Sequence, residues 1–242
     1  MTPIRIAMWS GPRNISTAMM RSWESRTDTF VCDEPLYAHY LKVTGLPHPG
    51  AAEVIAHHET DWRNVVRWLC GPIPGGKTVF YQKQMAHHLL PEIEEDWLDN
   101  VTNCFLIRDP ASMVVSLSEF IPAPILTDTG LPQQVRIFKR VLERTGKTPP
   151  VIDARDVLLD PRKMMTRLCE ALGLEFQEQM LKWRPGPRET DGIWAKHWYA
   201  KVYQTTEFGT YQPPSEATPT AFQPLVDQCR PLYEYLHQHR LR

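Results

Sequence analysis

Five short apolar runs, separated by longer segments of helical period, constrain the fold of this chain more than any other feature of its sequence. They are Ile4–Trp9, Phe30–Cys32, Thr78–Gln82, Cys104–Ile107 and Val151–Ala154. Their length and apolar content are typical of buried strands. Because strands that alternate with helices form parallel sheets covered on both faces, we expect an α/β fold. It should be a three-layer, doubly wound sheet of about five mainly parallel strands.

Apolar residues recur at three- to four-residue intervals between these runs and predict helices there. The predicted helices are Ser16–Arg26, Ala51–Leu69, a short one opening at Pro91, one opening at Asp109-Pro110, Gln133–Thr145, one running from Asp160-Pro161 to Gly173, and a last one from Phe222. Aspartate followed by proline favours a helix start, since the carboxylate caps free N–H groups and proline fits the first position. Proline-rich stretches at Pro122–Pro132 and Trp183–Arg188 are expected to be loops. Nothing in the sequence marks a second domain, so residues 1–242 are interpreted as one.

Charge and cysteine usage exclude several classes of protein. Lys+Arg number 27 and Asp+Glu 28, a net charge of -1, so no basic field favours nucleic acid or an anionic membrane as a partner. The five cysteines form no CxxC pair, which argues against a disulfide framework or a zinc ribbon. No apolar run is long enough for a signal peptide or a membrane span. We therefore expect a cytoplasmic protein, and the oligomeric state, a homodimer included, stays open.

Polar residues follow each predicted strand. In order along the chain they are the loop Ser10–Thr17, Asp33-Glu34, Lys83 with His87-His88, Arg108, and Arg155-Asp156. Ligands of open α/β sheets bind at the carboxyl ends of the strands, so these side chains should meet at one edge. The first loop joins a strand to a helix, where free N–H groups and the helix dipole attract an anion. An ordinary capped helix start would have the same appearance.

A second phosphate-loop pattern, GxxxxGK[ST], occurs at Gly71–Thr78. That pattern binds nucleotides only between a strand and a following helix. Here a predicted helix precedes it and a predicted strand follows it. Its two prolines also remove N–H donors that a phosphate would need. We expect a turn.

The loop Pro12-Arg13-Asn14-Ile15-Ser16-Thr17 resembles the phosphosulfate loop of the sulfotransferase family, which often reads Pro-Arg-Ser-Gly-Ser-Thr. That family's second motif is a strand-ending arginine with a serine eight positions later, as at Arg108 and Ser116. Further similarities are the segment Asp153–Gly173, the Glu-Pro-Leu at Glu34 known from carbohydrate sulfotransferases, and the Gly192–Lys196 loop. The resemblance covers about residues 4–196.

This resemblance implies 3′-phosphoadenosine 5′-phosphosulfate (PAPS) as sulfuryl donor, bound by a P-loop-like phosphosulfate loop, with 3′-phosphoadenosine 5′-phosphate (PAP) as product and no metal. Arg13 would neutralise the leaving phosphate. The implied donor-binding residues are Arg13, Asn14, Ile15, Ser16, Thr17, Arg108, Ser116, Trp194 and Lys196, with Ser112 as a competing ligand on the helix of Ser116. Trp194 belongs to an aromatic group that either covers the nucleotide, lines the acceptor pocket or forms a packing corner.

Several residues compete for the catalytic base. Glu34 leads, since it follows a strand at the sheet edge and the resemblance to carbohydrate sulfotransferases places a glutamate there. A buried site would also raise its pKa. His87 and His88 are the rivals, with a surface pair at a helix start as the bland alternative. Lys83 either contacts the sulfuryl oxygens or caps its strand. Tyr37 and His39, adjacent to Glu34, are expected to face the acceptor, a small hydroxylated metabolite or sugar that receives the group on a hydroxyl or amine.

Two departures from the family pattern bear on the donor site. Ile15 stands where glycine is expected, so the loop should avoid a positive φ angle there and be reshaped. Ala154 stands where many members have tyrosine. Two other functions remain open: a magnesium-dependent phosphotransferase that uses Gly76-Lys77-Thr78, and a sulfotransferase-like protein that binds nucleotide without turnover.

Overall fold

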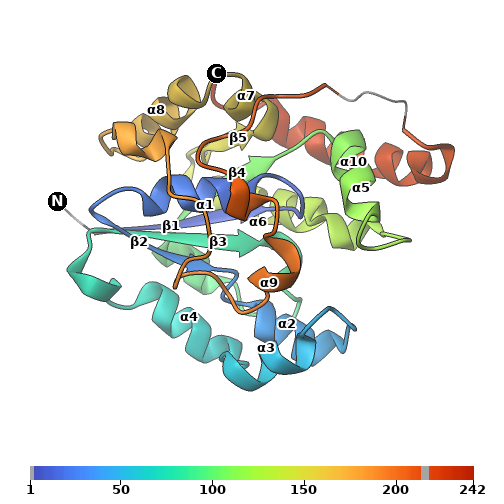
Figure 1. Ribbon diagram of the computed structural model, residues 1–242, viewed down its shortest axis with the longest axis horizontal. Helices are drawn as coiled ribbons and strands as arrows, with labels where there is room; N and C mark the ends of the chain where they lie inside the picture. Colours follow the sequence, from blue (N-terminus) through green and yellow to red (C-terminus); the bar gives the residue numbers. More distant parts are fainter. Residues whose placement is uncertain (1–2, 214–217) are drawn as a thin grey trace.

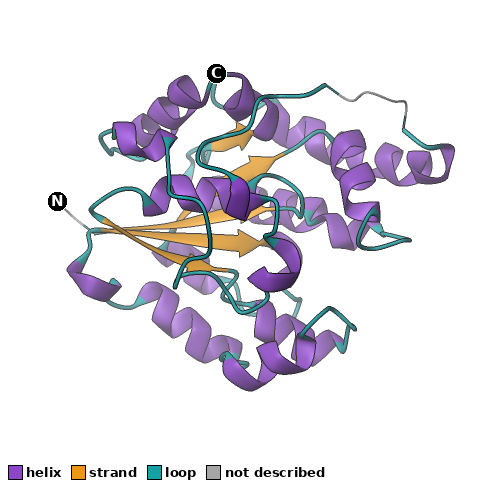
Figure 2. Cartoon of the chain, in the orientation of Figure 1, coloured by secondary structure: helices purple, strands orange, loops and turns teal. Residues whose placement is uncertain are grey.

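The computed structural model describes residues 3–213 and 218–242. It contains one sheet of five strands in the order β2-β3-β1-β4-β5, and every pairing is parallel. The strands are β1 Ile4–Ser10, β2 Thr29–Asp33, β3 Val79–Met85, β4 Thr102–Ile107 and β5 Val151–Asp153. Figure 2 shows them as orange arrows between purple helices. The predicted doubly wound α/β fold is confirmed.

Strand β1 is central and is buried from Ile6 onward. Side chains of a strand point alternately to opposite faces. Ile6 and Met8 accordingly join one apolar cluster, and Ala7 and Trp9 the other. Burial on both faces explains why the strand is a continuous apolar run rather than an alternating one.

Helices cover both faces of the sheet (Figure 1). One face carries α1 Ser16–Glu24, α7 Ala154–Leu159 and α8 Pro161–Ala171. The other carries α4 Trp62–Cys70, α5 Pro110–Ser118, α6 Leu131–Thr145 and α10 Gln223–His237. A third apolar cluster joins α2 Tyr37–Thr44, α3 Ala51–His57 and α9 Ala195–Trp198. Short 3₁₀ turns occur at Pro74–Gly76, Ala86–His88, Asp96–Asn100, Leu126–Thr129, Glu178–Leu181, Val202–Gln204 and Thr220–Phe222.

The two predicted aspartate–proline helix starts are confirmed. The Asp109 carboxylate accepts a hydrogen bond from the N–H of Ser112 at 3.1 Å, and that of Asp160 from Lys163 at 3.0 Å. The Gly71–Thr78 stretch is a turn that leads into β3, as expected.

Other boundaries differ from the predictions. The single helix expected over residues 51–69 is two, because Asp61 caps the start of α4 by accepting from the N–H of Arg63 at 2.9 Å. No helix opens at Pro91, where the chain makes turns instead. Ala154 begins α7 rather than ending a strand, since the Asp153 carboxylate caps that helix. Within the described residues, no helix is both long and apolar enough to cross a lipid bilayer.

Candidate active site

The loop between β1 and α1 presents free backbone donors at the carboxyl edge of the sheet. The first hydrogen bond of α1 runs from the N–H of Met19 to the Ile15 carbonyl at 3.0 Å. The N–H groups of residues 16–18 therefore have no partner within the helix. Ser16 and Thr17 are buried at this helix start. Asn14 is also buried, at the position just before Ile15.

Three residues at this edge have strained backbones. Among the described non-glycine residues, positive φ angles occur at Arg13 (63°), Ile15 (57°) and Glu34 (41°). Such conformations cost an L-residue about 1–2 kcal/mol and concentrate at functional sites. The expectation that Ile15 would avoid positive φ is wrong. Its side chain packs against the apolar cluster beneath α1, and this contact offsets the strain.

Two arginines and a serine predicted to bind the donor lie together. The Arg13 side chain donates from Nε to the Ser116 hydroxyl at 3.0 Å, and its guanidinium lies 4.7 Å from the centre of the Phe120 ring. Arg108 donates from Nη1 to the Arg13 carbonyl at 2.5 Å. Burial lowers the pKa of both guanidinium groups, but both stay charged at neutral pH. Of the two serines considered on α5, Ser116 is the one that contacts Arg13.

A buried acid–lysine cluster lies on the same edge. The Lys83 ammonium contacts Asp33 Oδ1 at 2.8 Å, Glu34 Oε1 at 2.5 Å and the Tyr199 hydroxyl at 2.6 Å. The side chains of Lys83 and Asp33 are each 1 % exposed, and that of Glu34 is 13 % exposed. The Tyr199 hydroxyl also lies 2.8 Å from Asp33 Oδ2. Within this cluster Glu34 is therefore the carboxylate closest to solvent.

Burial and the neighbouring charges in this cluster shift the pKa values of Glu34 and Lys83. Burial raises the pKa of Glu34, the neighbouring Asp33 charge adds to the rise, and Lys83 opposes it. Burial acts to lower the pKa of Lys83, but the charges of Asp33 and Glu34 outweigh it and raise that pKa well above its ordinary value. Lys83 is thus an ammonium group. Glu34 has the raised pKa that a carboxylate base needs.

His87 and His88 are poor rivals as the base. Burial lowers the pKa of His87 to about 3 and that of His88 well below its ordinary value, so both imidazoles are neutral and weakly basic. His88 packs against the rings of both Tyr37 and Tyr40, with centroid distances of 4.8 and 4.6 Å. Its Nδ1 is 4.0 Å from Glu34 Oε2. The alternative interpretation of His87 and His88 as a surface pair is wrong for His88, which is 2 % exposed.

The two residues predicted to face the acceptor, Tyr37 and His39, have different surroundings in the structure. Tyr37 stacks on His88 beside Glu34, and its hydroxyl bonds His48 Nδ1 at 2.9 Å. His39 instead bonds the Thr60 carbonyl through Nδ1 at 2.9 Å. Residues two apart on a helix do not share a face, and both lie on α2. The structure therefore places Tyr37, but not His39, against the side chains around Glu34.

The two residues expected over the nucleotide make contacts with the helices around them. Trp194 is buried with its ring edge-on to Tyr37, at a centroid distance of 5.0 Å. The Lys196 ammonium pairs with the Glu53 carboxylate of α3 at 2.5 Å. Both side chains lie where α2, α3 and α9 meet, and their binding to a nucleotide stays a prediction.

From the sequence, one member of the site was missed and the role of a second one stayed open. Asp33 was one of the polar residues after the second strand, but no role was assigned to it. A lysine predicted inside a sheet needs a counter-charge, which is the signal that would have found Asp33. Tyr199 belongs to the same aromatic group as Trp194, whose role the sequence left open, and it contacts Lys83 from 116 positions further along the chain.

Known proteins resemble this chain over nearly its whole length. A family profile described as a sulfotransferase domain matches residues 4–239. Branched-chain-amino-acid aminotransferase-like proteins 1 and 2 of Arabidopsis thaliana are each 34% identical to it, over 98% and 97% of this chain. The chain spans only 42% and 41% of the length of these two relatives.

Two solved structures share the fold. The sulfotransferase domain of a Synechococcus olefin synthase is 17% identical with a TM-score of 0.54, over 94% of both chains. A sulfotransferase from Alicyclobacillus acidocaldarius is 13% identical with a TM-score of 0.54, over 100% of this chain and 98% of that one. At these identities the likeness concerns the fold alone. The family profile covers nearly all of the sequence, and the chain belongs to the sulfotransferase domain family.

Proposed function

We propose that this chain transfers the sulfuryl group of PAPS to a hydroxyl or amine of a small acceptor. The observation that carries the proposal is the convergence, at one edge of the sheet, of an anion site and a buried base. The anion site comprises Arg13, Arg108, Ser116 and the free N–H groups of α1. The base is Glu34, paired with Lys83.

The anion site fits a donor with phosphate at both the 3′ and the 5′ position. Arg108 and Ser116 would hold the 3′-phosphate, since a guanidinium binds phosphate oxygens in a planar fork. Ser16, Thr17 and the start of α1 would hold the 5′-phosphosulfate. Arg13 contacts both residues of the 3′-phosphate site: its side chain bonds to Ser116, and its carbonyl accepts from Arg108. It would neutralise the charge that develops on the leaving phosphate.

Glu34 and Lys83 fit the chemistry of the transfer. The Glu34 carboxylate takes the proton of the acceptor hydroxyl, and the acceptor oxygen attacks sulfur in line with the bond to the phosphate. That sulfur–oxygen bond breaks as the new one forms, and PAP leaves. The Lys83 ammonium stabilises negative charge on the sulfuryl oxygens. Tyr37, stacked on His88 next to Glu34, would contact the acceptor.

The phosphotransferase alternative has no support at this edge. Lys77 precedes β3, so it lies at the amino end of that strand, opposite the anion site. Its ammonium donates to the Thr27 carbonyl at 2.6 Å. Gly75 and Gly76 form a turn and not the start of a long helix.

Nucleotide binding tests the donor site directly. Calorimetric titration should show that PAP binds more tightly than AMP, which lacks the 3′-phosphate, and more tightly than ATP with magnesium. In Arg108→Ala the affinity for PAP should fall about 10- to 100-fold, because a charge-assisted hydrogen bond contributes about 1.5–3 kcal/mol. Lys77→Ala is the matched control and should bind PAP like the wild type. Preference for ATP with magnesium, or loss of binding in Lys77→Ala, would overturn the donor assignment.

The pH dependence of transfer tests the base. Glu34 must be ionised to accept a proton, and burial raises its pKa. The rate is therefore expected to fall as pH drops through a midpoint above ~4.3, the ordinary glutamate value. His87 and His88 do not produce this limb, since their pKa values are lowered. Initial rates measured across the acidic range, with PAP affinity followed over the same range to correct for the donor, give the midpoint. A limb that persists in Glu34→Gln would assign the base to another residue.

A further inference from the structure

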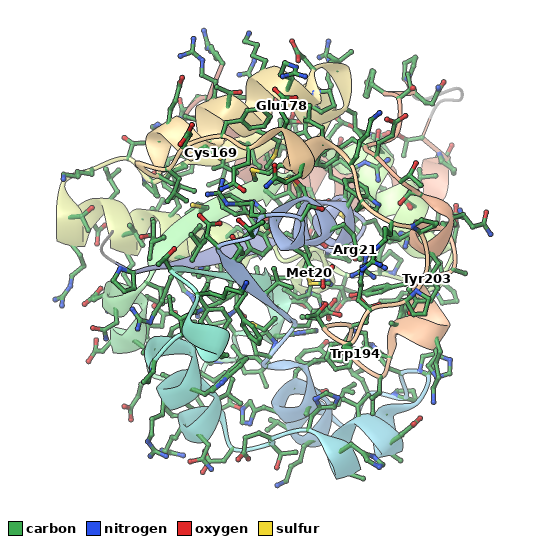
Figure 3. The ribbon with its side chains drawn as sticks, turned by 60° about the vertical axis from the view of Figure 1, so that its left-hand side comes forward. Met20, Arg21, Cys169, Glu178, Trp194 and Tyr203 are labelled. Atoms are coloured by element: carbon green, nitrogen blue, oxygen red, sulfur yellow. The ribbon has the colours of Figure 1, made fainter. Side chains whose placement is uncertain are left out.

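Tyr199 reaches the acid–lysine cluster from the C-terminal part of the chain. Residues 191–199, here called the crossover segment, contain α9, and Figure 1 shows this helix in orange beyond the carboxyl end of β3. The segment is anchored on α1 as well, where Arg21 Nη2 contacts Asp191 Oδ2 at 2.8 Å. Figure 3 shows Trp194 of this segment and the nearby Tyr203 on the side of the molecule where Arg21 lies. The crossover segment thus closes over side chains of β2 and β3.

Asp33 is the point at which the crossover segment meets the sheet. Its Oδ2 accepts a hydrogen bond from the Gly192 N–H at 3.1 Å, and the Tyr199 hydroxyl lies within 2.9 Å of both carboxylate oxygens. The Tyr199 oxygen in turn accepts from Lys83 at 2.6 Å. Tyr199 thus donates to the acid and accepts from the ammonium, so its hydroxyl links the two charges.

Lys83 has no spare donor. An ammonium group has three N–H bonds, and those of Lys83 are directed at Asp33, Glu34 and Tyr199. To contact a sulfuryl oxygen, Lys83 must release one partner. Asp33 and Tyr199 are buried and bonded to each other, whereas Glu34 is the most exposed member of the cluster. The Glu34 contact is the one that the geometry allows to open.

We propose that Tyr199 is a positioning residue for sulfuryl transfer: with Asp33 it holds the Lys83 ammonium in place while Lys83 exchanges Glu34 for the transferring group. The proposal rests on the proposed function. The exchange leaves two of the three ammonium hydrogen bonds intact, so the charge does not move as the sulfuryl group arrives. It also frees the Glu34 carboxylate at the moment when the acceptor proton must be taken.

The same arrangement directs that proton to Glu34. Asp33 accepts from Lys83, Tyr199 and Gly192, whereas Lys83 is the donor that Glu34 gives up. Hydrogen bonds to a carboxylate favour its ionised form. Two adjacent carboxylates in unequal surroundings take different roles. Asp33 holds the ammonium, and Glu34 receives the proton.

Replacing Tyr199 with phenylalanine removes the hydroxyl and keeps the ring. We expect kcat to fall about 10- to 100-fold, the loss that follows when a catalytic group is misplaced by about 1 Å. Affinity for PAP, which has no sulfuryl group, should stay within about threefold of wild type. Tyr81→Phe is the matched control, because Tyr81 is a fully buried tyrosine on the strand of Lys83 whose hydroxyl has no partner among the described residues. Its kcat should equal that of the wild type.

A second readout does not depend on transfer. In protein labelled with ¹⁵N at the lysine side chains, the buried and fully bonded Lys83 ammonium should give a slowly exchanging NMR signal, assigned by its loss in Lys83→Met. This signal should shift or broaden in Tyr199→Phe and not in Tyr81→Phe. A changed signal with an unchanged kcat, or a reduced kcat with an unchanged signal, would overturn the positioning role. If the wild type binds PAP but transfers nothing, the proposed function fails, and the signal alone decides whether Tyr199 positions Lys83.

Discussion

Replacing Glu34 with glutamine is expected to lower kcat by about 10²–10⁴-fold, the contribution that a positioned base makes to proton transfer. Glutamine keeps the size of the side chain and leaves its oxygen available to Lys83, so the cluster should remain assembled. It cannot take up a proton at neutral pH. Affinity for PAP should change little, since Arg13, Arg108 and Ser116 lie outside the substitution. Steady-state rates and calorimetric PAP titration of the purified variant give the two quantities.

A matched control separates the loss of a base from the loss of any carboxylate. Glu92 is a partly exposed glutamate that lies 3.4 Å from His39 Nε2, and Glu92→Gln should transfer at the wild-type rate. Retention of more than about a tenth of the wild-type kcat in Glu34→Gln would show that another group takes the proton. His88, 4.0 Å from Glu34, would then be the first to consider.

Replacing Lys83 with methionine is expected to lower the free energy of unfolding by about 3–5 kcal/mol, because it leaves buried carboxylates without their counter-charge. Asp33 is the main source of this cost. Its side chain is 1 % exposed, and it accepts hydrogen bonds from three donors in the intact cluster. Transfer should be lost as well. Urea unfolding followed by circular dichroism measures the change in stability.

Two further variants test whether the unpaired charge causes the loss of stability. Lys163 is exposed on α8, and Lys163→Met should shift stability by less than about 0.5 kcal/mol. In the double variant Lys83→Met with Asp33→Asn, part of the stability should return because one unpaired charge is gone. A loss below about 1 kcal/mol in Lys83→Met would mean that the cluster is neutral and not ionic.

The fold was predictable because strand length and helical period are local properties. The five apolar runs coincide with the five strands, and the aspartates at 109 and 160 cap helices where proline follows them. Helix ends that depend on tertiary contacts were not predictable. The expected helix over residues 51–69 joined α3 to α4, since nothing in its apolar period shows the break that Asp61 caps.

The candidate site was predictable where each motif lies next to a strand end. Arg13, Arg108 and Ser116 come together because parallel strands end at one edge. The backbone of Ile15 was not predictable from residue type, because the strain is compensated by side-chain packing that only the folded chain provides. His39 was placed at the site by adjacency in sequence and Lys196 by the resemblance of its loop to the family pattern, whereas in the structure they contact Thr60 and Glu53. The role of Tyr199 depends on how a distant segment returns to the sheet.

The position of β1 has a consequence for the making of the protein. This strand is synthesised well before its pairing partners: Ile4 pairs with Val79, and Ile6 with Thr102. At about 5–20 residues per second, synthesis reaches Val79 roughly 4–15 s after Ile4. Through that interval an apolar strand with two unpaired edges is present on the nascent chain, and such a segment readily binds to others of its kind. Strand β1 therefore stays open to such binding until β3 and β4 have been synthesised.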